Sequence, residues 1–449
     1  MQNKIFELTA TEISQVIKSC EATASEVANS FLERTQEIDG KIGAWVTFSP
    51  SYIGSQAAQF DISPTNSYLS GVPVGIKDIF NTEFYPTQKG CDAWRGYQAG
   101  NDARCVSYLR NHGAIIFGKT DTAELAVHAL GKAKNPYDTS RVAGSSSSGS
   151  AAAVATAMVP IALGSQTGGS TIRPGSWCGV FAMKPSFGLI PRTGVLKTTD
   201  TLDTIGFFGR APQDLSLLLE AMRVRGDNFP IQTRQLANYQ NLPKKKWRVA
   251  FCENEFSQTI DPIVRQSLNN LKEELLKHQS VEVVSLPLPS QTQNFQALHR
   301  RIYHPCLAYY LKTEFEKSGD HVSDSLKAIF EDAKTIPPQD FSFALKEQSE
   351  LAGVVSRFFS ENGIDFILTH SSNGPAPFEE PQRHVDLNQL WTMTWLPVVN
   401  VPCWQDPSGL PFGLSVVGPR YSDYRLLDFV TDLGEKGVFP ERSLIALLH

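Results

Sequence analysis

The sequence has little cysteine and no excess of basic charge. Only seven of its 449 residues are cysteine, an odd and unclustered set, which favours reduced thiols over a disulfide framework. Lysine and arginine total 41 against 46 aspartate and glutamate, so the net charge of −5 gives no electrostatic support for a nucleic-acid partner. No stretch reaches the roughly 18 apolar residues that cross a bilayer, and no basic segment followed by an apolar one opens the chain. We expect a cytoplasmic protein that binds neither nucleic acid nor a membrane.

Several common catalytic and ligand-binding motifs are also missing. There is no CxxC, no HExxH and no GxSxG, and no Ser-His-Asp set stands out, so we expect neither a metal site nor a histidine base. His299 and His304 are five residues apart, a spacing that places them poorly on one helical face. Residues 113–120 match the P-loop pattern GxxxxGK[ST], but the four middle residues are apolar. They predict a buried strand over 114–117 with a turn after it.

What the chain does have is a large apolar fraction arranged in alternating elements. Hydrophobic residues make up 41% of the sequence, enough for an extensive core. From about residue 71, short apolar runs alternate with helical patterns, which predicts an α/β fold whose sheet is covered on both faces. We expect helices over residues 103–112, 121–130, 150–158, 262–278 and 342–361, and strands over 114–117, 159–163, 248–251, 281–286, 366–369, 396–401 and 414–417.

Two more helices are predicted in the first forty residues. Thr9-x-x-Glu12 and Thr23-x-x-Glu26 both have the capping-box form, in which two side chains satisfy unpaired amides at a helix start. Gly40 is expected to end the second helix.

The segment Gly71-Val-Pro-Val-Gly-Ile-Lys-Asp places a lysine, Lys77, inside an apolar stretch. A lysine there costs free energy if it is charged and unpaired. It could pair with Asp78 or extend to solvent, or it could be a desolvated amine with a depressed pKa that acts as a base. The segment alone leaves these alternatives open.

Two further segments are rich in glycine and serine. Residues 144–150 read Gly-Ser-Ser-Ser-Ser-Gly-Ser before an alanine-rich helix, and are either a linker or a loop facing the helix N-terminus. Residues 164–174 read Gly-Ser-Gln-Thr-Gly-Gly-Ser-Thr-Ile-Arg-Pro after a predicted strand. The Gly-Gly pair before Ser170 could present consecutive amides around its hydroxyl, as in an oxyanion hole, or could form an ordinary tight turn.

Taken in this order, the three segments resemble the amidase signature family of serine hydrolases. Further segments resemble the family at residues 135–141, 178–185, 203–210 and 410–419. The resemblance implies a large, mixed and mainly parallel sheet covered on both faces by helices. It also implies one domain over residues 1–449 with a core signature region at about 65–215. The polar, proline-broken residues 226–245 are a candidate insertion or loop boundary.

The resemblance also implies the catalytic residues. Ser170 is the expected nucleophile, Ser146 the cis-serine that bridges it to the base, and Lys77 the base. The expected oxyanion hole consists of the backbone amides of Thr167, Gly168, Gly169 and Ser170. No metal or organic cofactor is implied.

The function implied is an amidohydrolase that cleaves a small-molecule amide through an acyl-enzyme. Alternatives are the catalytic subunit of a larger complex, an amide-forming acyltransferase, or a non-catalytic scaffold. Gln166 and the order Thr-Ile-Arg-Pro after Ser170 depart from the family members that act with transfer RNA, which argues against that role. A homodimer or a small accessory subunit remains open.

The substrate pocket is the least specified part of the site. Residues 145 and 148 are serine where the family usually has glycine, and serine adopts positive φ less readily. His370 stands where many relatives have proline, in a region that borders the acyl pocket. The candidate substrate contacts are Ser145, Phe207, Tyr303, His370, Trp391 and Trp395.

Overall fold

The computed structural model describes residues 5–127, 130–225, 246–253, 260–318, 322–378 and 386–446. The candidate insertion at 226–245 lies outside these residues. The strands are β1 (Trp45–Phe48), β2 (Pro73–Lys77), β3 (Ile115–Thr120), β4 (Ile161–Gln166), β5 (Phe181–Lys184), β6 (Thr204–Gly209), β7 (Trp247–Glu253), β8 (Val281–Pro287), β9 (Phe366–His370), β10 (Val398–Gln405) and β11 (Pro411–Val417).

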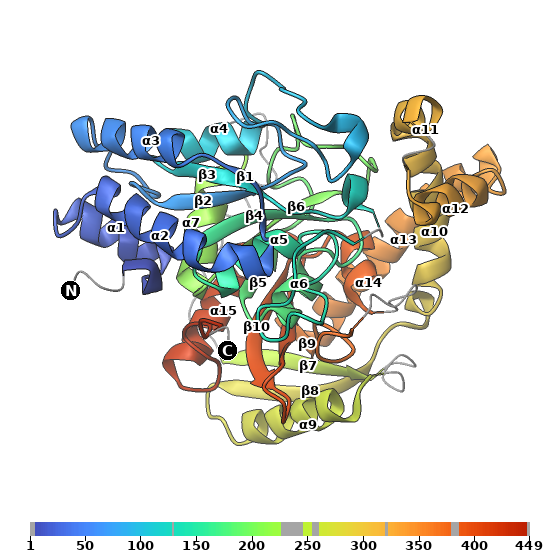
Figure 1. Ribbon diagram of the computed structural model, residues 1–449. Coiled ribbons are helices and arrows are strands. Elements are labelled where there is room, and N and C mark those ends of the chain that lie inside the picture. Colours follow the sequence, from blue (N-terminus) through green and yellow to red (C-terminus); the bar gives the residue numbers. More distant parts are fainter. Residues whose placement is uncertain are drawn as a thin grey trace.

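Helices occupy most of the remaining described chain (Figure 1). They are α1 (Ala10–Lys18), α2 (Ala24–Ile42), α3 (Pro50–Ile62), α4 (Arg104–Asn111), α5 (Ser148–Ala155), α6 (Ile172–Trp177), α7 (Pro212–Met222), α9 (Pro262–Leu276), α10 (Phe295–Tyr310), α11 (Lys312–Ser318), α12 (Asp324–Ala333), α13 (Pro338–Asn362), α14 (Asn388–Met393) and α15 (Asp423–Glu435). Short 3₁₀ helices lie at η1 (Ile5–Glu7), η2 (Asp92–Trp94), η3 (Glu124–Ala126) and η5 (Ser290–Thr292). No helix of the described residues is long and apolar enough to cross a membrane.

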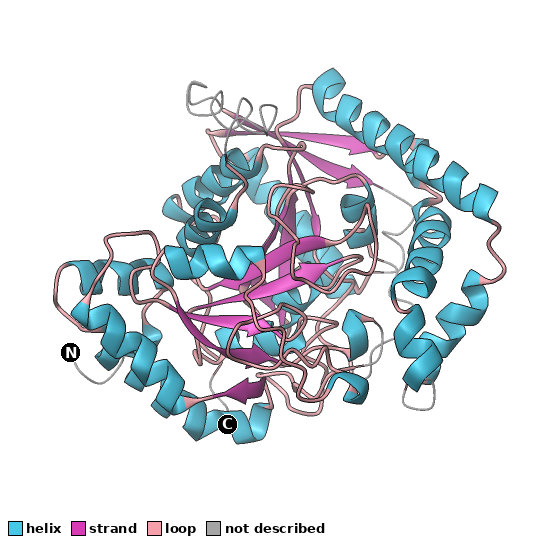
Figure 2. Cartoon of the chain, turned by 90° about the horizontal axis from the view of Figure 1, so that it is seen from above, coloured by secondary structure: helices cyan, strands magenta, loops and turns pink. Residues whose placement is uncertain are grey.

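The strands join one 11-stranded sheet in the order β1-β3-β2-β4-β6-β5-β10-β11-β9-β7-β8. Nearly every residue of β2, β3, β4, β5, β6, β9 and β11 is buried, so both faces of the central sheet are covered. Figure 2 shows helices on either side of the strands. The predicted α/β class and large mixed sheet are confirmed.

The sheet is less parallel than the resemblance implied. Parallel pairing is confined to β3-β2-β4 on one side and β9-β7-β8 on the other. The central strands from β4 to β9 pair antiparallel, as do β1 and β3. The two parallel groups are therefore joined by an antiparallel centre, and β2 and β4, which carry two of the motif segments, are adjacent.

Most of the predicted elements are present with shifted ends, and both predicted capping boxes form. Gly40 is the wrong terminus for the second helix: α2 continues to Ile42 and ends at Gly43, which takes the left-handed conformation (φ 69°) that a helix C-cap favours. The helix predicted over 121–130 is also wrong. Only η3 forms there, because the amide of Leu125 donates to the carbonyl oxygen of Lys89 in another loop (2.8 Å).

The P-loop pattern belongs to strand β3, which continues through Gly118, Lys119 and Thr120 where a turn was expected. Lys119 is fully buried and pairs with the equally buried Asp78 at 3.0 Å. The lysine is therefore committed to an internal ion pair.

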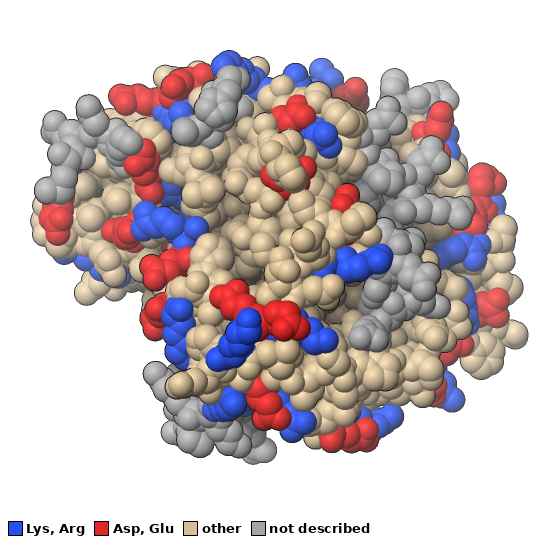
Figure 3. All heavy atoms as spheres, turned by 90° about the horizontal axis from the view of Figure 1, so that it is seen from below, with Lys and Arg blue, Asp and Glu red and all other residues tan. Residues whose placement is uncertain are grey.

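A second group of helices, α10 to α14, packs around its own apolar cluster beside the sheet (Figure 1). The same cluster includes Ile172, two residues after the predicted nucleophile. On the face shown in Figure 3, basic and acidic side chains are interspersed, and neither sign dominates.

Candidate active site

Lys77 lies at the end of β2, fully buried, with its amine among three serine hydroxyls. The Nζ atom is 2.7 Å from Ser146 Oγ, 3.0 Å from Ser147 Oγ and 2.7 Å from Ser165 Oγ. No carboxylate of the described residues forms an ion pair with it, because the neighbouring Asp78 pairs with Lys119. Burial holds the pKa of Lys77 well below its ordinary value, and the negative charge of Asp203 opposes this shift only in part. The alternatives of an Asp78 pair and of a solvent-exposed amine are thus wrong.

The sheet brings these serines to the lysine. Strand β2 pairs in parallel with β4, whose Ser165 lies one residue before its end, and Ser146 and Ser147 lie just before α5. The approach of the serine loop to β4 needs a glycine at position 164. A Cβ there would lie 3.0 Å from Ser147 Oγ and 2.7 Å from the ring of Phe208.

A count of protons limits which serine can give one to the amine. A neutral lysine amine has two hydrogens and one lone pair, so one of the three hydroxyls must donate to it. Ser147 already uses its proton, since its hydroxyl donates to the carbonyl oxygen of Ser165 (3.3 Å). The donor is therefore Ser146 or Ser165.

The serine loop tolerates the two residues that replace the family's glycines. The peptide bond between Ser145 and Ser146 is cis. Neither Ser145 nor Ser148 has a positive φ, and Ser148 is the first residue of α5. The positive φ falls on Gly144 (133°), where a Cβ would meet Pro174 at 2.6 Å.

Ser170 lies between β4 and α6 and is partly exposed. Gln166 shapes the turn that carries it: its Oε1 accepts from the amides of Thr171 and Ile172, each at 3.0 Å. Within the described chain the Ser170 hydroxyl has no hydrogen-bond partner, so a link between Ser146 and Ser170 stays a prediction.

The residues predicted to form the oxyanion hole lie in the same turn. Among the described residues, none accepts a hydrogen bond from the backbone amides of Gly168, Gly169 or Ser170. These amides are therefore available to a ligand, which fits an oxyanion hole better than an ordinary hydrogen-bonded turn.

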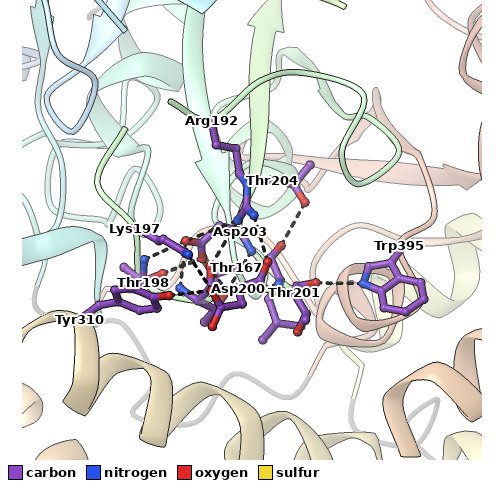
Figure 4. A network of polar contacts seen from close by, with 12 residues as sticks. Thr167, Arg192, Lys197, Thr198, Asp200, Thr201, Asp203, Thr204, Tyr310 and Trp395 are labelled. Atoms are coloured by element: carbon purple, nitrogen blue, oxygen red, sulfur yellow. Dashed lines mark hydrogen bonds and ion pairs between the residues drawn. The ribbon is translucent and has the colours of Figure 1, made fainter. Parts of the chain in front are cut away.

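Asp203 is a residue of the site that sequence reasoning placed only within a family segment (Figure 4). Its carboxylate accepts from the hydroxyls of Thr167 (2.8 Å), Thr198 (2.6 Å) and Thr199 (2.8 Å). It also accepts from the amides of Thr198 and Thr199, while Arg192 lies 3.9 Å away. The network ties the nucleophile turn to the loop before β6, and its charge acts on Lys77.

The candidate substrate contacts do not form one group. Phe207 and Trp391 are completely buried, in two different apolar clusters, which argues against direct contact with substrate. Tyr303 and Ser145 are also buried, with 6% and 4% of their surfaces exposed. Trp395 is partly exposed, and its indole donates to the carbonyl oxygen of Thr201 at 2.9 Å (Figure 4).

His370 is the remaining candidate and ends strand β9 inside the protein. Burial lowers its pKa to about 4, so the imidazole is neutral at pH 7.

Two side chains that sequence reasoning missed hold the nucleophile turn from the C-terminal helices. His299 of α10 lies with Nε2 3.0 Å from the carbonyl oxygen of Thr167, and Thr392 of α14 donates to that of Gly168 at 2.8 Å. They are 132 and 224 residues from their partners, so no local pattern signals them.

Comparison with known proteins points in one direction. A family model described as Amidase matches residues 26–427. One subunit of the glutamyl-tRNA(Gln) amidotransferase of Koribacter versatilis (strain Ellin345) is 28% identical over 482 aligned positions, covering 95% of this chain and 97% of the relative. The subunit of the same name from Clostridium novyi (strain NT) is 28% identical and covers 96% of each chain.

Solved structures show the same fold. A structure of 6-aminohexanoate cyclic dimer hydrolase complexed with substrate gives a TM-score of 0.84 at 22% identity, covering 97% of this chain and 98% of that one. The glutamyl-tRNA(Gln) amidotransferase subunit of this name from Thermotoga maritima gives 0.79 at 22% identity, covering 99% of both. At these identities the likeness is one of fold.

Proposed function

The chain belongs to the amidase family, as its motifs predicted, and on that premise we propose that it hydrolyses a carboxylic amide through a Ser170 acyl-enzyme. A serine hydroxyl is a weak nucleophile that must lose its proton as it attacks, and a neutral amine is a suitable base. The observation that carries the proposal is a fully buried Lys77 amine surrounded by hydroxyls, with no carboxylate of the described chain paired to it.

The proposed steps move one proton along two hydroxyls. Lys77 takes the proton of Ser146 while Ser146 takes that of Ser170, and Ser170 Oγ attacks the amide carbon. The amides near 167–170 bind the oxyanion. Collapse of the intermediate breaks the C–N bond as Ser146 protonates the departing nitrogen and recovers a proton from Lys77. Water then enters by the same relay and releases the carboxylic acid.

A second candidate, favoured by the names of the relatives, is glutamine hydrolysis within a larger complex. Gln166 argues against the tRNA-linked version. Its amide nitrogen donates to Thr392 Oγ1 at 3.1 Å while its oxygen holds two backbone amides, and an aspartate at this position could not donate. An acyltransferase would differ only in the nucleophile that enters second. The cytoplasmic location, the homodimer and the accessory subunit stay predictions.

The chemistry is tested first with a serine-reactive fluorophosphonate and mass mapping of the adduct. We expect labelling at Ser170 that is lost in Lys77→Ala and Ser146→Ala. Turnover should fall by several orders of magnitude in each variant, and a double variant should be hardly worse than either single one, because the residues act as a unit. Modest, independent losses would exclude the relay.

Substrate is tested with a panel of simple acyl amides, anilides and amino-acid amides. Ammonia release from glutamine separates the second candidate from the first. Adding hydroxylamine as an acyl acceptor measures transfer against hydrolysis.

A further inference from the structure

We propose that His299 is a positioning residue for the oxyanion hole, which it orients by holding the carbonyl oxygen of Thr167. This inference rests on the proposed function, since it assigns a task in the same reaction. It makes helix α10, from the C-terminal half of the chain, part of the apparatus that stabilises the transition state.

The argument starts from the planarity of the peptide bond. In a trans peptide the C=O of one residue and the N–H of the next point in opposite directions. The only cis bond among the described residues is the one between Ser145 and Ser146, so the peptides of the nucleophile turn are trans. Whatever holds a carbonyl in this turn therefore also fixes the direction of the following amide.

Each carbonyl of the turn is held by a donor. Thr167 O receives Nε2 of His299 (3.0 Å), Gly168 O receives Thr392 Oγ1 (2.8 Å), and Gly169 O receives the amide of Arg173 (3.0 Å). The amides of Gly168, Gly169 and Ser170 must then point away from α10, α14 and α6 in turn. Because these amides have no acceptor in the described chain, they are left for a ligand oxygen.

His299 is the stronger of the two side-chain donors. A carbonyl oxygen can only accept, so Nε2 carries the hydrogen. The imidazole is 6% exposed, which fixes its place and shields the bond from water. Thr392 has one proton to share between Gly168 O and the carbonyl oxygen of Asn388, both at 2.8 Å.

Thr167 is held on its other side as well. Its hydroxyl donates to Asp203 at 2.8 Å, so the side chain and the carbonyl of one residue are anchored to separate parts of the fold (Figure 4). With the side chain fixed, loss of the carbonyl anchor leaves the Thr167–Gly168 peptide free to rotate, which would turn the Gly168 amide away from the oxyanion.

The test compares His299→Gln with His299→Asn. The glutamine amide reaches about as far as Nε2 and can donate to Thr167 O, whereas the asparagine amide reaches only about as far as Nδ1. We expect His299→Asn to lower kcat about 10- to 100-fold with KM changed less than about threefold, since a complete loss of one oxyanion donor costs about 10²–10³. His299→Gln should recover most of the parental kcat.

A second measurement separates oxyanion binding from general disturbance. Phenylboronic acid forms a tetrahedral adduct with a serine nucleophile, so its inhibition constant should weaken in step with kcat/KM across the variants. Thr392→Val, nearly the same in volume, should give a smaller loss of the same kind. Cys306→Ala, a buried change two turns further along the same helix, serves as the control for packing and should leave kcat and the inhibition constant within about twofold.

The outcomes are decisive in both directions. Equal kcat values for His299→Asn and His299→Gln, or a boronate constant that does not follow kcat/KM, would overturn the inference. Ser170→Ala is measured beside them: if it abolishes turnover while the His299 variants do not differ, only the positioning role fails. If Ser170→Ala leaves turnover intact, the proposed function itself fails.

Discussion

The acid limb of the pH–rate profile should report the proton of Lys77, and Ser165→Ala should move it. Below the pKa of Lys77 the amine is charged and cannot accept a proton, so kcat/KM should rise with pH as the ammonium deprotonates. Burial lowers this pKa well below its ordinary value, so the limb should lie far below the range of an exposed lysine.

The size of the shift follows from the hydrogen bonds that Lys77 makes. Ser165 is one of three hydroxyls around Nζ, at 2.7 Å. A hydrogen bond to a charged group stabilises by about 1.5–3 kcal/mol and a neutral one by about 0.5–1.5, so removing Ser165 costs the ammonium about 1–1.5 kcal/mol more than the amine. Since about 1.36 kcal/mol corresponds to one pKa unit, the acid limb should move to lower pH by about one unit.

The assay is kcat/KM for a chromogenic anilide or other accepted amide between about pH 5 and 10, by initial rates. The proton count leaves Ser146 as the donor once Ser165 is gone, so the rate on the plateau should stay within several-fold of the parent. Ser150→Ala is the matched control, because its hydroxyl donates to the carbonyl oxygen of Leu163 and does not contact Lys77. A limb that stays in place, or moves to higher pH, would show that Lys77 is not the titrating base.

The remaining predictions concern stability and are measured by urea unfolding. Phe207→Ala should cost about 3–5 kcal/mol, because the ring is fully buried, and an unchanged stability with a raised KM would instead place it in the pocket. Lys119→Met should cost about 3–5 kcal/mol by leaving Asp78 buried and unpaired, and adding Asp78→Leu should recover part of it; an additive loss would contradict the pair. Burial lowers the pKa of Lys184 to about 7, so between pH 7 and about 10 the unfolded chain binds more protons and stability should rise by up to about 1.4 kcal/mol per pH unit; Lys184→Met should reduce that slope, and an unchanged slope would refute it.

The sequence was most informative where function depends on local residue types. Lys77, the serine loop and the Gly-Gly-Ser turn follow from short segments, because a buried lysine and consecutive glycines are unusual enough to recognise in isolation. The burial of Lys77 and its bond to Ser146 confirm the part of that prediction that geometry can test. The catalytic roles themselves remain proposals.

Sequence reasoning failed where partners come from distant segments. The helix expected over 121–130 is replaced by a loop whose amide bonds to Lys89, a contact that no local propensity records. Phe207 and Trp391 are aromatic residues of segments expected near the site, but burial depends on how strands and helices pack, and both lie in apolar clusters. His299 suggests only a metal ligand when taken from the sequence, since its partner Thr167 is 132 residues away.

Two buried lysines on adjacent strands show how the fold decides which amine can become a base. Lys77 of β2 and Lys119 of β3 are both fully buried, and Lys77 pairs in register with Thr120 while Lys119 pairs with Ile76. Successive side chains along a strand point to opposite faces, so Asp78 faces away from Lys77 and toward Lys119, with which it forms an ion pair at 3.0 Å. A shift of one residue in this register would give Lys77 the carboxylate and stabilise its charged form. The alternation of the strand thus keeps the acid next to Lys77 in sequence on the other side of the sheet, and leaves only hydroxyls where a neutral amine is needed.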